Sequence, residues 1–205
     1  MCTLADPVMT YGALRAEAPR RAIEAAVDDG SLIRLRRGVY AREGACEPVT
    51  AAARHGGPLA CVTAARHLGL WVLDESDTVH VWMRGHGRAH AHAPCSCTAH
   101  WDDDSAIDAF GFPSVPRILV QILACRGVEE FFVVLESALR TPKITEEELV
   151  WLRRHVNDAG RGAIAFARAT SVWDQPDARG TAESVSVSVA VTVCCSPSRT
   201  SVIFA

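Results

Sequence analysis

Apolar and polar residues near the start of the chain are spaced as in an amphipathic helix. Between residues 19 and 29 the apolar side chains fall on one side at 100° per residue: Ala22, Ile23, Ala26 and Val27. The arginines and acidic residues of the segment fall on the other side. A proline precedes it and a glycine follows it, as is common at the two ends of a helix. The pattern predicts an amphipathic helix over residues 19–29.

Residues 32–41 have the period-two spacing of a β-hairpin. Ile33 and Leu35 alternate with arginines, which places the arginines on the solvent-facing side of a strand. An arginine–glycine pair allows a turn, and residues 39–41 can return as a second strand. With a short helix over residues 11–17, the order becomes helix, turn, helix, glycine and basic hairpin. This order predicts a winged helix-turn-helix.

The rest of the chain has a mixed pattern of helices and strands. Further helices are expected over residues 48–55, 61–70, 118–125, 129–139, 146–155 and 161–169. Residues 78–83 and 95–101 are candidate strands on either side of a loop rich in His, Arg and Gly. We therefore expect an α+β fold, in which an N-terminal winged helix-turn-helix is followed by a mixed α/β domain with C-terminal helices. The expected boundaries are 1–45 for the winged helix, 46–170 for the second domain and 171–205 for an irregular, poorly ordered tail.

Composition limits the class of protein. The chain has 205 residues, of which 49% are hydrophobic, so it can bury a core and general disorder is excluded. Its apolar runs are too short to cross a bilayer, and its first residues lack the basic and apolar segments of a signal peptide. We expect a cytoplasmic protein without a membrane partner, whose eight cysteines are reduced. The net charge of −3 means that any contact with DNA must come from a local basic patch.

The segment around the hairpin resembles a known family. Gly30 to Tyr40 match the pattern G-x-L-x-R-x-R-R-G-V-Y, within a run from Ala18 to Ala41 that resembles the N-terminal domain of AbiEi-type antitoxins. T-A-A-R-H-L-G-L (63–70), V-H-V (79–81) and L-E-S-A-L-R (135–140) are similar to actinobacterial members, and the likeness covers roughly residues 10–170. It implies a type IV toxin–antitoxin or phage-defence system. Members repress their own operon and oppose a toxin encoded nearby without forming a stable complex with it.

Five arginines are the candidate DNA contacts. Arg20 and Arg21 begin the candidate recognition helix, where side chains reach base edges or phosphates. Arg34, Arg36 and Arg37 on the hairpin would neutralise backbone phosphates. Glu24 and Asp28 place negative charge on the same helix face, which counts against this interpretation. We expect a transcriptional repressor that binds double-stranded DNA at its own promoter, and the alternative is a protein-interaction module with solvated arginines.

A second alternative is a non-catalytic relative of very-short-patch-repair endonucleases. Many actinobacterial proteins similar to this one continue into such a domain, which begins with a Glu-Ser pair, and Glu183–Ser184 stands at that place. No Asp or Glu follows Glu183, so the acidic metal ligands of such a nuclease are missing. The sequence also has no recognisable catalytic motif. We therefore expect no enzymatic activity and no cofactor.

A cluster of histidines and cysteines raises the question of a metal. The candidate ligands are His90, His92, Cys95, Cys97 and His100, with His86 nearby. Both residue types bind zinc, but C-x-C is not the usual zinc-knuckle spacing and no second cysteine pair lies at finger distance. The favoured prediction is a mobile basic loop without a metal. Cys61 and Cys125 fall on apolar helix faces and are expected in the core.

Overall fold

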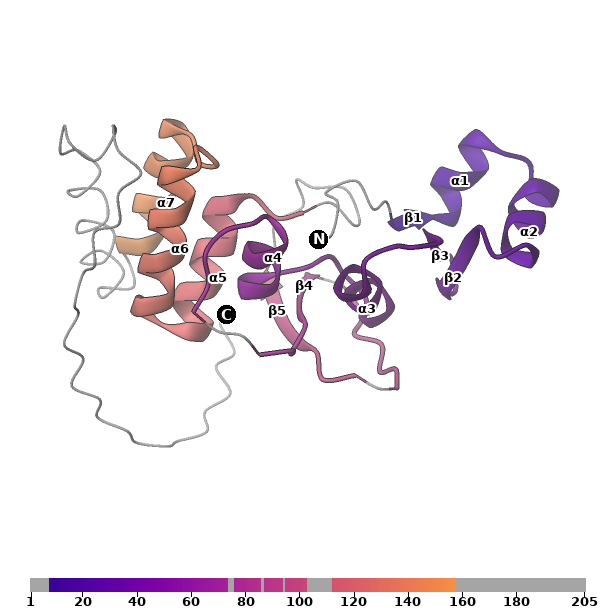
Figure 1. The fold of residues 1–205 in the computed structure, drawn as a ribbon, viewed down its shortest axis with the longest axis horizontal. Helices are drawn as coiled ribbons and strands as arrows, with labels where there is room; N and C mark the ends of the chain where they lie inside the picture. Colours follow the sequence, from indigo (N-terminus) through magenta and orange to yellow (C-terminus); the bar gives the residue numbers. More distant parts are fainter. Residues whose placement is uncertain (1–7, 74–75, 86, 94, 103–111, 158–205) are drawn as a thin grey trace.

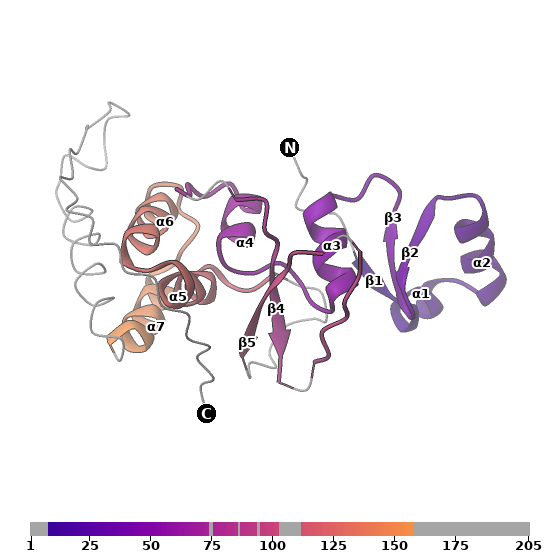
Figure 2. The same ribbon diagram turned by 90° about the horizontal axis from the view of Figure 1, so that it is seen from below.

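The computed structural model describes residues 8–73, 76–85, 87–93, 95–102 and 112–157. Within these residues the protein is a mixed α+β molecule of seven helices and five strands. Figures 1 and 2 show an elongated arrangement, with the first three strands and first two helices at one end and the last three helices at the other. The expected helix over 161–169 and the tail over 171–205 lie outside the described residues.

The N-terminal module, residues 8–42, combines a three-stranded antiparallel sheet with two helices. Its elements are β1 (Val8–Thr10), α1 (Tyr11–Glu17), α2 (Arg20–Asp28), β2 (Leu32–Arg36) and β3 (Val39–Arg42). The strand order is β1-β3-β2. The helices pack on one face of the sheet around a small buried cluster of Ile23, Leu32 and Tyr40. Thr10 caps α1, because its hydroxyl accepts a hydrogen bond from the Ala13 amide at 3.1 Å.

The burial pattern of strand β2 differs from the expected alternation of buried apolar and exposed basic residues. Leu32 is buried, whereas Ile33 is 38% exposed. The pairing with β3 shifts register between Arg34 and Arg36, as in a β-bulge. Arg34 lies opposite Tyr40 and Arg36 lies opposite Val39, so the two arginines face opposite sides of the sheet. Simple alternation would have placed both on the solvent side.

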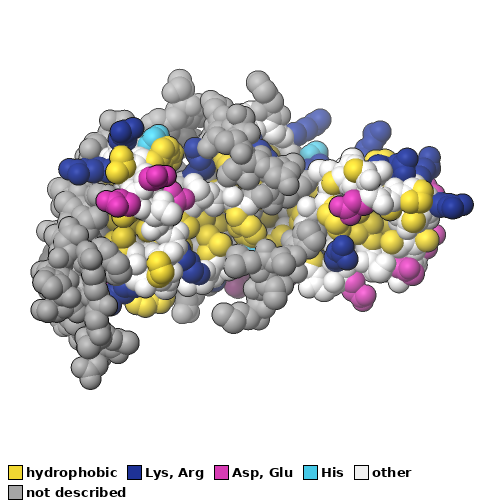
Figure 3. Space-filling view, turned by 90° about the horizontal axis from the view of Figure 1, so that it is seen from above, with side chains coloured by type: hydrophobic (Ala, Val, Ile, Leu, Met, Phe, Trp, Pro, Cys, Tyr) yellow, Lys and Arg dark blue, Asp and Glu magenta, His cyan; other side chains and the backbone are white. Residues whose placement is uncertain are grey.

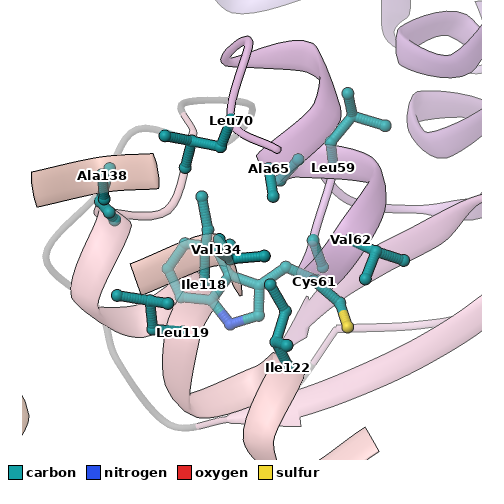
Figure 4. Close-up of a cluster of buried hydrophobic side chains, with 14 of the residues drawn as sticks. Leu59, Cys61, Val62, Ala65, Leu70, Ile118, Leu119, Ile122, Val134 and Ala138 are labelled. Carbon is teal, nitrogen blue, oxygen red and sulfur yellow. The ribbon is translucent and has the colours of Figure 1, made fainter. Parts of the chain in front are cut away.

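The larger body of the protein, residues 47–157, contains the remaining elements. They are α3 (Glu47–His55), α4 (Cys61–His67), β4 (His80–Arg84), β5 (Thr98–Asp102), α5 (Val115–Arg126), α6 (Val128–Arg140) and α7 (Glu146–Asn157). Strands β4 and β5 are parallel, and helix α5 packs against α4, α6 and α7. Figure 4 shows Leu59 and Val62 at one side of the main core and Ile118, Leu119 and Val134 at the other. These contacts join α4 to the helical end of the molecule.

Two further observations bear on the sequence predictions. Cys46 is disulfide-bonded, so the expectation that all eight cysteines are reduced is wrong.

Among the described residues, no helix combines the length and the apolar character needed to span a bilayer.

Gly57 is required by a close approach between the end of α3 and strand β4. A Cβ atom at this position would lie 2.0 Å from the Trp82 carbonyl oxygen, and the Trp82 amide donates to the Pro58 carbonyl at 2.9 Å. Gly57→Ala is therefore expected to lower the free energy of unfolding by about 1–3 kcal/mol, because the backbone must move. Gly12→Ala is the matched control in α1, where the Thr10 hydroxyl at 3.9 Å is the one atom of the described residues that the new Cβ would contact.

Because alanine has a higher helix propensity than glycine, Gly12→Ala is expected to stabilise the protein by about 0.5 kcal/mol. Urea denaturation of both variants measures the two effects. Equal midpoints for the two variants would show that β4 does not approach Gly57 this closely.

Candidate functional site

Four of the five candidate arginines are exposed on the N-terminal module, and the fifth is not. Arg20, Arg21, Arg34 and Arg37 are exposed. Arg36 is half-buried, and its Nε donates to the Ala53 carbonyl of α3 at 2.9 Å. Burial lowers the pKa of the Arg36 guanidinium. Its expected position on the solvent face is therefore wrong, because the bulge in β2 directs Arg36 toward α3.

A pair of tyrosines lies beside two of the exposed arginines, Arg20 and Arg34. The Tyr11 amide donates to the Gly38 carbonyl at 2.9 Å, so the hairpin turn that carries Arg37 is attached to the start of α1. The Tyr11 and Tyr40 ring centroids are 6.3 Å apart. Arg34 lies opposite Tyr40 on the neighbouring strand. The hairpin turn and the start of α1 are thus fixed to one another.

Arg20 belongs to the same region and is ion-paired. Its Nε lies 2.7 Å from a Glu24 carboxylate oxygen, and both side chains are mostly exposed. Three causes raise the pKa of Arg20. The largest is the hydrogen bond to Glu24, the next is the negative charge of that carboxylate, and the third is the nearby Tyr11. An exposed pair of this kind is weak, so a phosphate could replace Glu24 as the partner of Arg20. Figure 3 shows the basic side chains toward the tip and one edge of this end of the molecule, with acidic ones toward the other edge.

Two clusters of histidine and cysteine lie in the larger body. The outer cluster consists of His55, His92, Cys95 and Cys97, and the inner cluster of Cys61, His80, His100 and Cys125. In each, one nitrogen or sulfur atom per residue lies within 4.8 Å of the corresponding atoms of the other three. Each cluster therefore offers two thiols and two imidazoles at a single point.

The outer cluster joins the end of α3 to the loop before β5. Cys95 Sγ lies 3.4 Å from His55 Nδ1 and 3.0 Å from Cys97 Sγ, and Cys97 Sγ lies 4.0 Å from His92 Nε2. Three of the candidates from the sequence are thus brought together. His55 was missed because it belongs to a distant helix. His90 is not in the cluster, although its amide donates to the His55 carbonyl at 2.7 Å.

The inner cluster was not expected. Cys61 begins α4, His80 begins β4, His100 lies within β5 and Cys125 lies near the end of α5. His80 Nδ1 lies 2.8 Å from His100 Nε2 and 4.0 Å from Cys125 Sγ. Cys61 is buried as expected for a core residue, but Cys125 is exposed, so its expected place in the core is wrong. His100 belongs here rather than with the loop histidines.

The cysteines of the clusters differ in acidity. Hydrogen bonds from Cys61, His100 and His80 lower the pKa of the Cys125 thiol. The hydrogen bond with Cys125, together with burial, raises the pKa of Cys61. Burial, together with the neighbouring Cys95, raises the pKa of Cys97 to about 12. The pKa values of the two thiols in the inner cluster are thus shifted in opposite directions.

Comparison with known proteins identifies no family but finds a solved structure that is similar. No family model matches the chain, and no curated protein matches it. Among solved structures, the Rv2827c protein from Mycobacterium tuberculosis is similar, with 17% sequence identity and a TM-score of 0.42. The alignment covers 85% of this chain and 77% of that one.

Proposed function

We propose that the N-terminal module binds double-stranded DNA and that the protein is an AbiEi-like repressor of its own promoter. The observation that carries the proposal is that Arg20, Arg21, Arg34 and Arg37 are all exposed on this one small module. In this proposal the module is a winged helix-turn-helix, with α2 as the recognition helix and the β2–β3 hairpin as the wing. Arg20 and Arg21 are at the start of α2, where side chains of a recognition helix meet the major groove.

The hairpin arginines contact phosphates only, whereas Arg20 and Arg21 of α2 reach base edges or phosphates. Arg34 and Arg37 contact phosphates, which fixes the position of the module on the duplex without reading sequence. Arg36 instead holds the hairpin against α3 through the Ala53 carbonyl. The remaining antitoxin role, opposition to a toxin encoded nearby without a stable complex, comes from the family resemblance.

The direct test is binding of the purified full chain to a labelled duplex from upstream of its own reading frame, followed by fluorescence anisotropy. With about four phosphate contacts, the logarithm of the binding constant should fall with the logarithm of salt concentration with a slope of about −3 to −4. A scrambled duplex of equal length and composition is the control and should bind more weakly. Binding that is absent, or unchanged by salt, would contradict the proposal and favour a protein-interaction module.

Removing the carboxylate that pairs with Arg20 is expected to strengthen DNA binding. Glu24→Gln releases Arg20 for a phosphate and removes a negative charge that faces the duplex, so affinity should rise by about two- to fivefold. Glu136→Gln is the matched control. It breaks a pair with Arg140 of the same spacing on α6, at 2.9 Å, with the same change of charge. Equal effects of the two variants would mean that α2 does not face DNA.

A further inference from the structure

We propose that Cys61, His80, His100 and Cys125, the inner cluster, hold a structural zinc ion. Two cysteines and two histidines form one of the commonest ligand sets of structural zinc sites. The proposal concerns the larger body of the protein and does not depend on DNA binding by the N-terminal module.

The distances within the inner cluster suit a tetrahedral ion. With Zn–S of about 2.3 Å and Zn–N of about 2.0–2.1 Å, tetrahedral ligand atoms lie about 3.4–3.8 Å apart. The measured separations of 2.8 Å between His80 and His100 and 4.0 Å between His80 and Cys125 lie on either side of this range. All four ligand atoms lie within 4.8 Å of one another. Shifts of less than about 1 Å in these two separations would bring them to the zinc values.

Cys61 has a strained backbone conformation. Cys61 has φ of +49°, and it is the one non-glycine residue with positive φ among those described. Such strain persists where the surroundings enforce it and is concentrated at functional sites. The Cys61 amide donates to the Gln121 side chain of α5 at 3.0 Å, which fixes the start of α4 against the helix that also carries Cys125. The strained conformation places a thiol, rather than a simple apolar side chain, among two imidazoles and a second thiol.

Four protein ligands leave no open coordination position, so the ion is structural rather than catalytic. It connects α4, β4, β5 and α5, which come from distant parts of the sequence. The cysteines bind as thiolates, and any proton that they carry is released to solvent when the ion enters. Cys125 is exposed, which gives the ion a route of entry.

We also propose that the outer cluster holds a second zinc ion, through separate residues and contacts. His55, His92, Cys95 and Cys97 again form a Cys2His2 set, with Cys95 Sγ 3.4 Å from His55 Nδ1. An ion here would tie the loop before β5 to the end of α3, beside the backbone contact from His90 to His55. Because all four residues are exposed or only half-buried, this site should release its metal to a chelator before the inner one.

The experiment is elemental analysis of the untagged full chain, purified without chelator, so that no histidine tag adds metal. The expected result is two zinc ions per chain. Cys125→Ser with His100→Gln should leave one, Cys95→Ser with Cys97→Ser should leave one, and all four changes together should leave none. His90→Gln is the matched control, since its ring lies outside both clusters, and it should keep two.

A measurement on the wild-type chain covers the case in which a variant fails to fold. Metal-free protein is treated with N-ethylmaleimide, with and without two equivalents of zinc, and the modified cysteines are located by mass spectrometry. Zinc should reduce the modification rate of exposed Cys125 and Cys95 by at least about tenfold. Absence of zinc from the purified chain together with equal modification of Cys125 would overturn the inner site. Equal modification of Cys95 would overturn the outer site.

Discussion

Arg34→Ala combined with Arg37→Ala is expected to weaken binding of duplex DNA by about tenfold or more at roughly 0.1 M salt. Each lost contact between an arginine and a phosphate also releases one fewer counterion, so the salt slope should become shallower by about 2. Both residues lie on the hairpin that is attached to α1 through the Tyr11 amide, and both are exposed. Their removal should therefore leave the fold of the module intact, which circular dichroism checks.

The control for this double variant is Arg153→Ala with Arg154→Ala. These two exposed arginines lie on α7, at the opposite end of the molecule, and their loss changes the net charge equally. Affinity and salt slope should stay close to those of the wild type. If both double variants lose affinity equally, the binding follows net charge and the hairpin has no special role.

The fold was largely predictable where a regular spacing coincided with a clear end signal. The expected helix over 19–29 appears as α2 (Arg20–Asp28), with Pro19 before it and Gly30 just after it. Strand β1 was missed because three residues directly before a helix leave no alternation to detect. Arg34 is exposed as expected, but the side to which Arg36 points was predicted wrongly, because the bulge between them changes the side to which every later residue points.

The histidine–cysteine clusters were only partly predictable, for a reason that lies in the topology. Cys95 and Cys97 are close in sequence to His92, and local spacing was enough to single them out. The inner cluster is assembled from four elements that meet only after β4 and β5 pair in parallel and α5 packs against α4. A search for short ligand spacings cannot find such a site. It would need a prediction of which strands and helices become neighbours.

The exposure of the arginines was predictable only in part. Exposed positions on an amphipathic helix follow from its periodicity, and Arg20 and Arg21 are exposed as expected. Arg36 was assigned to the solvent by the same argument applied to a strand, and its hydrogen bond to Ala53 connects the hairpin to α3 instead. Long-range hydrogen bonds of this kind have no local sequence signal.

Phe131→Ala is expected to lower the free energy of unfolding by about 3–5 kcal/mol, the largest effect on stability that we predict. The side chain of Phe131, which lies on α6, is fully buried in the main core. Its loss removes buried apolar surface and leaves a cavity that the surrounding helices can fill only in part. Urea denaturation followed by both fluorescence and circular dichroism measures the change and tests whether unfolding has two states.

Phe132→Ala is the control, because Phe132 is the next residue of α6 and only half-buried. The same atoms are removed, so a difference between the two variants reports packing rather than composition. A loss for Phe131 no larger than that for Phe132 would contradict the assignment of Phe131 to the core. The main core is also separate from the cluster of Ile23, Leu32 and Tyr40 in the N-terminal module. Phe131→Ala should therefore leave DNA affinity unchanged at temperatures where the variant is folded, whereas the hairpin variant changes affinity and leaves stability unchanged.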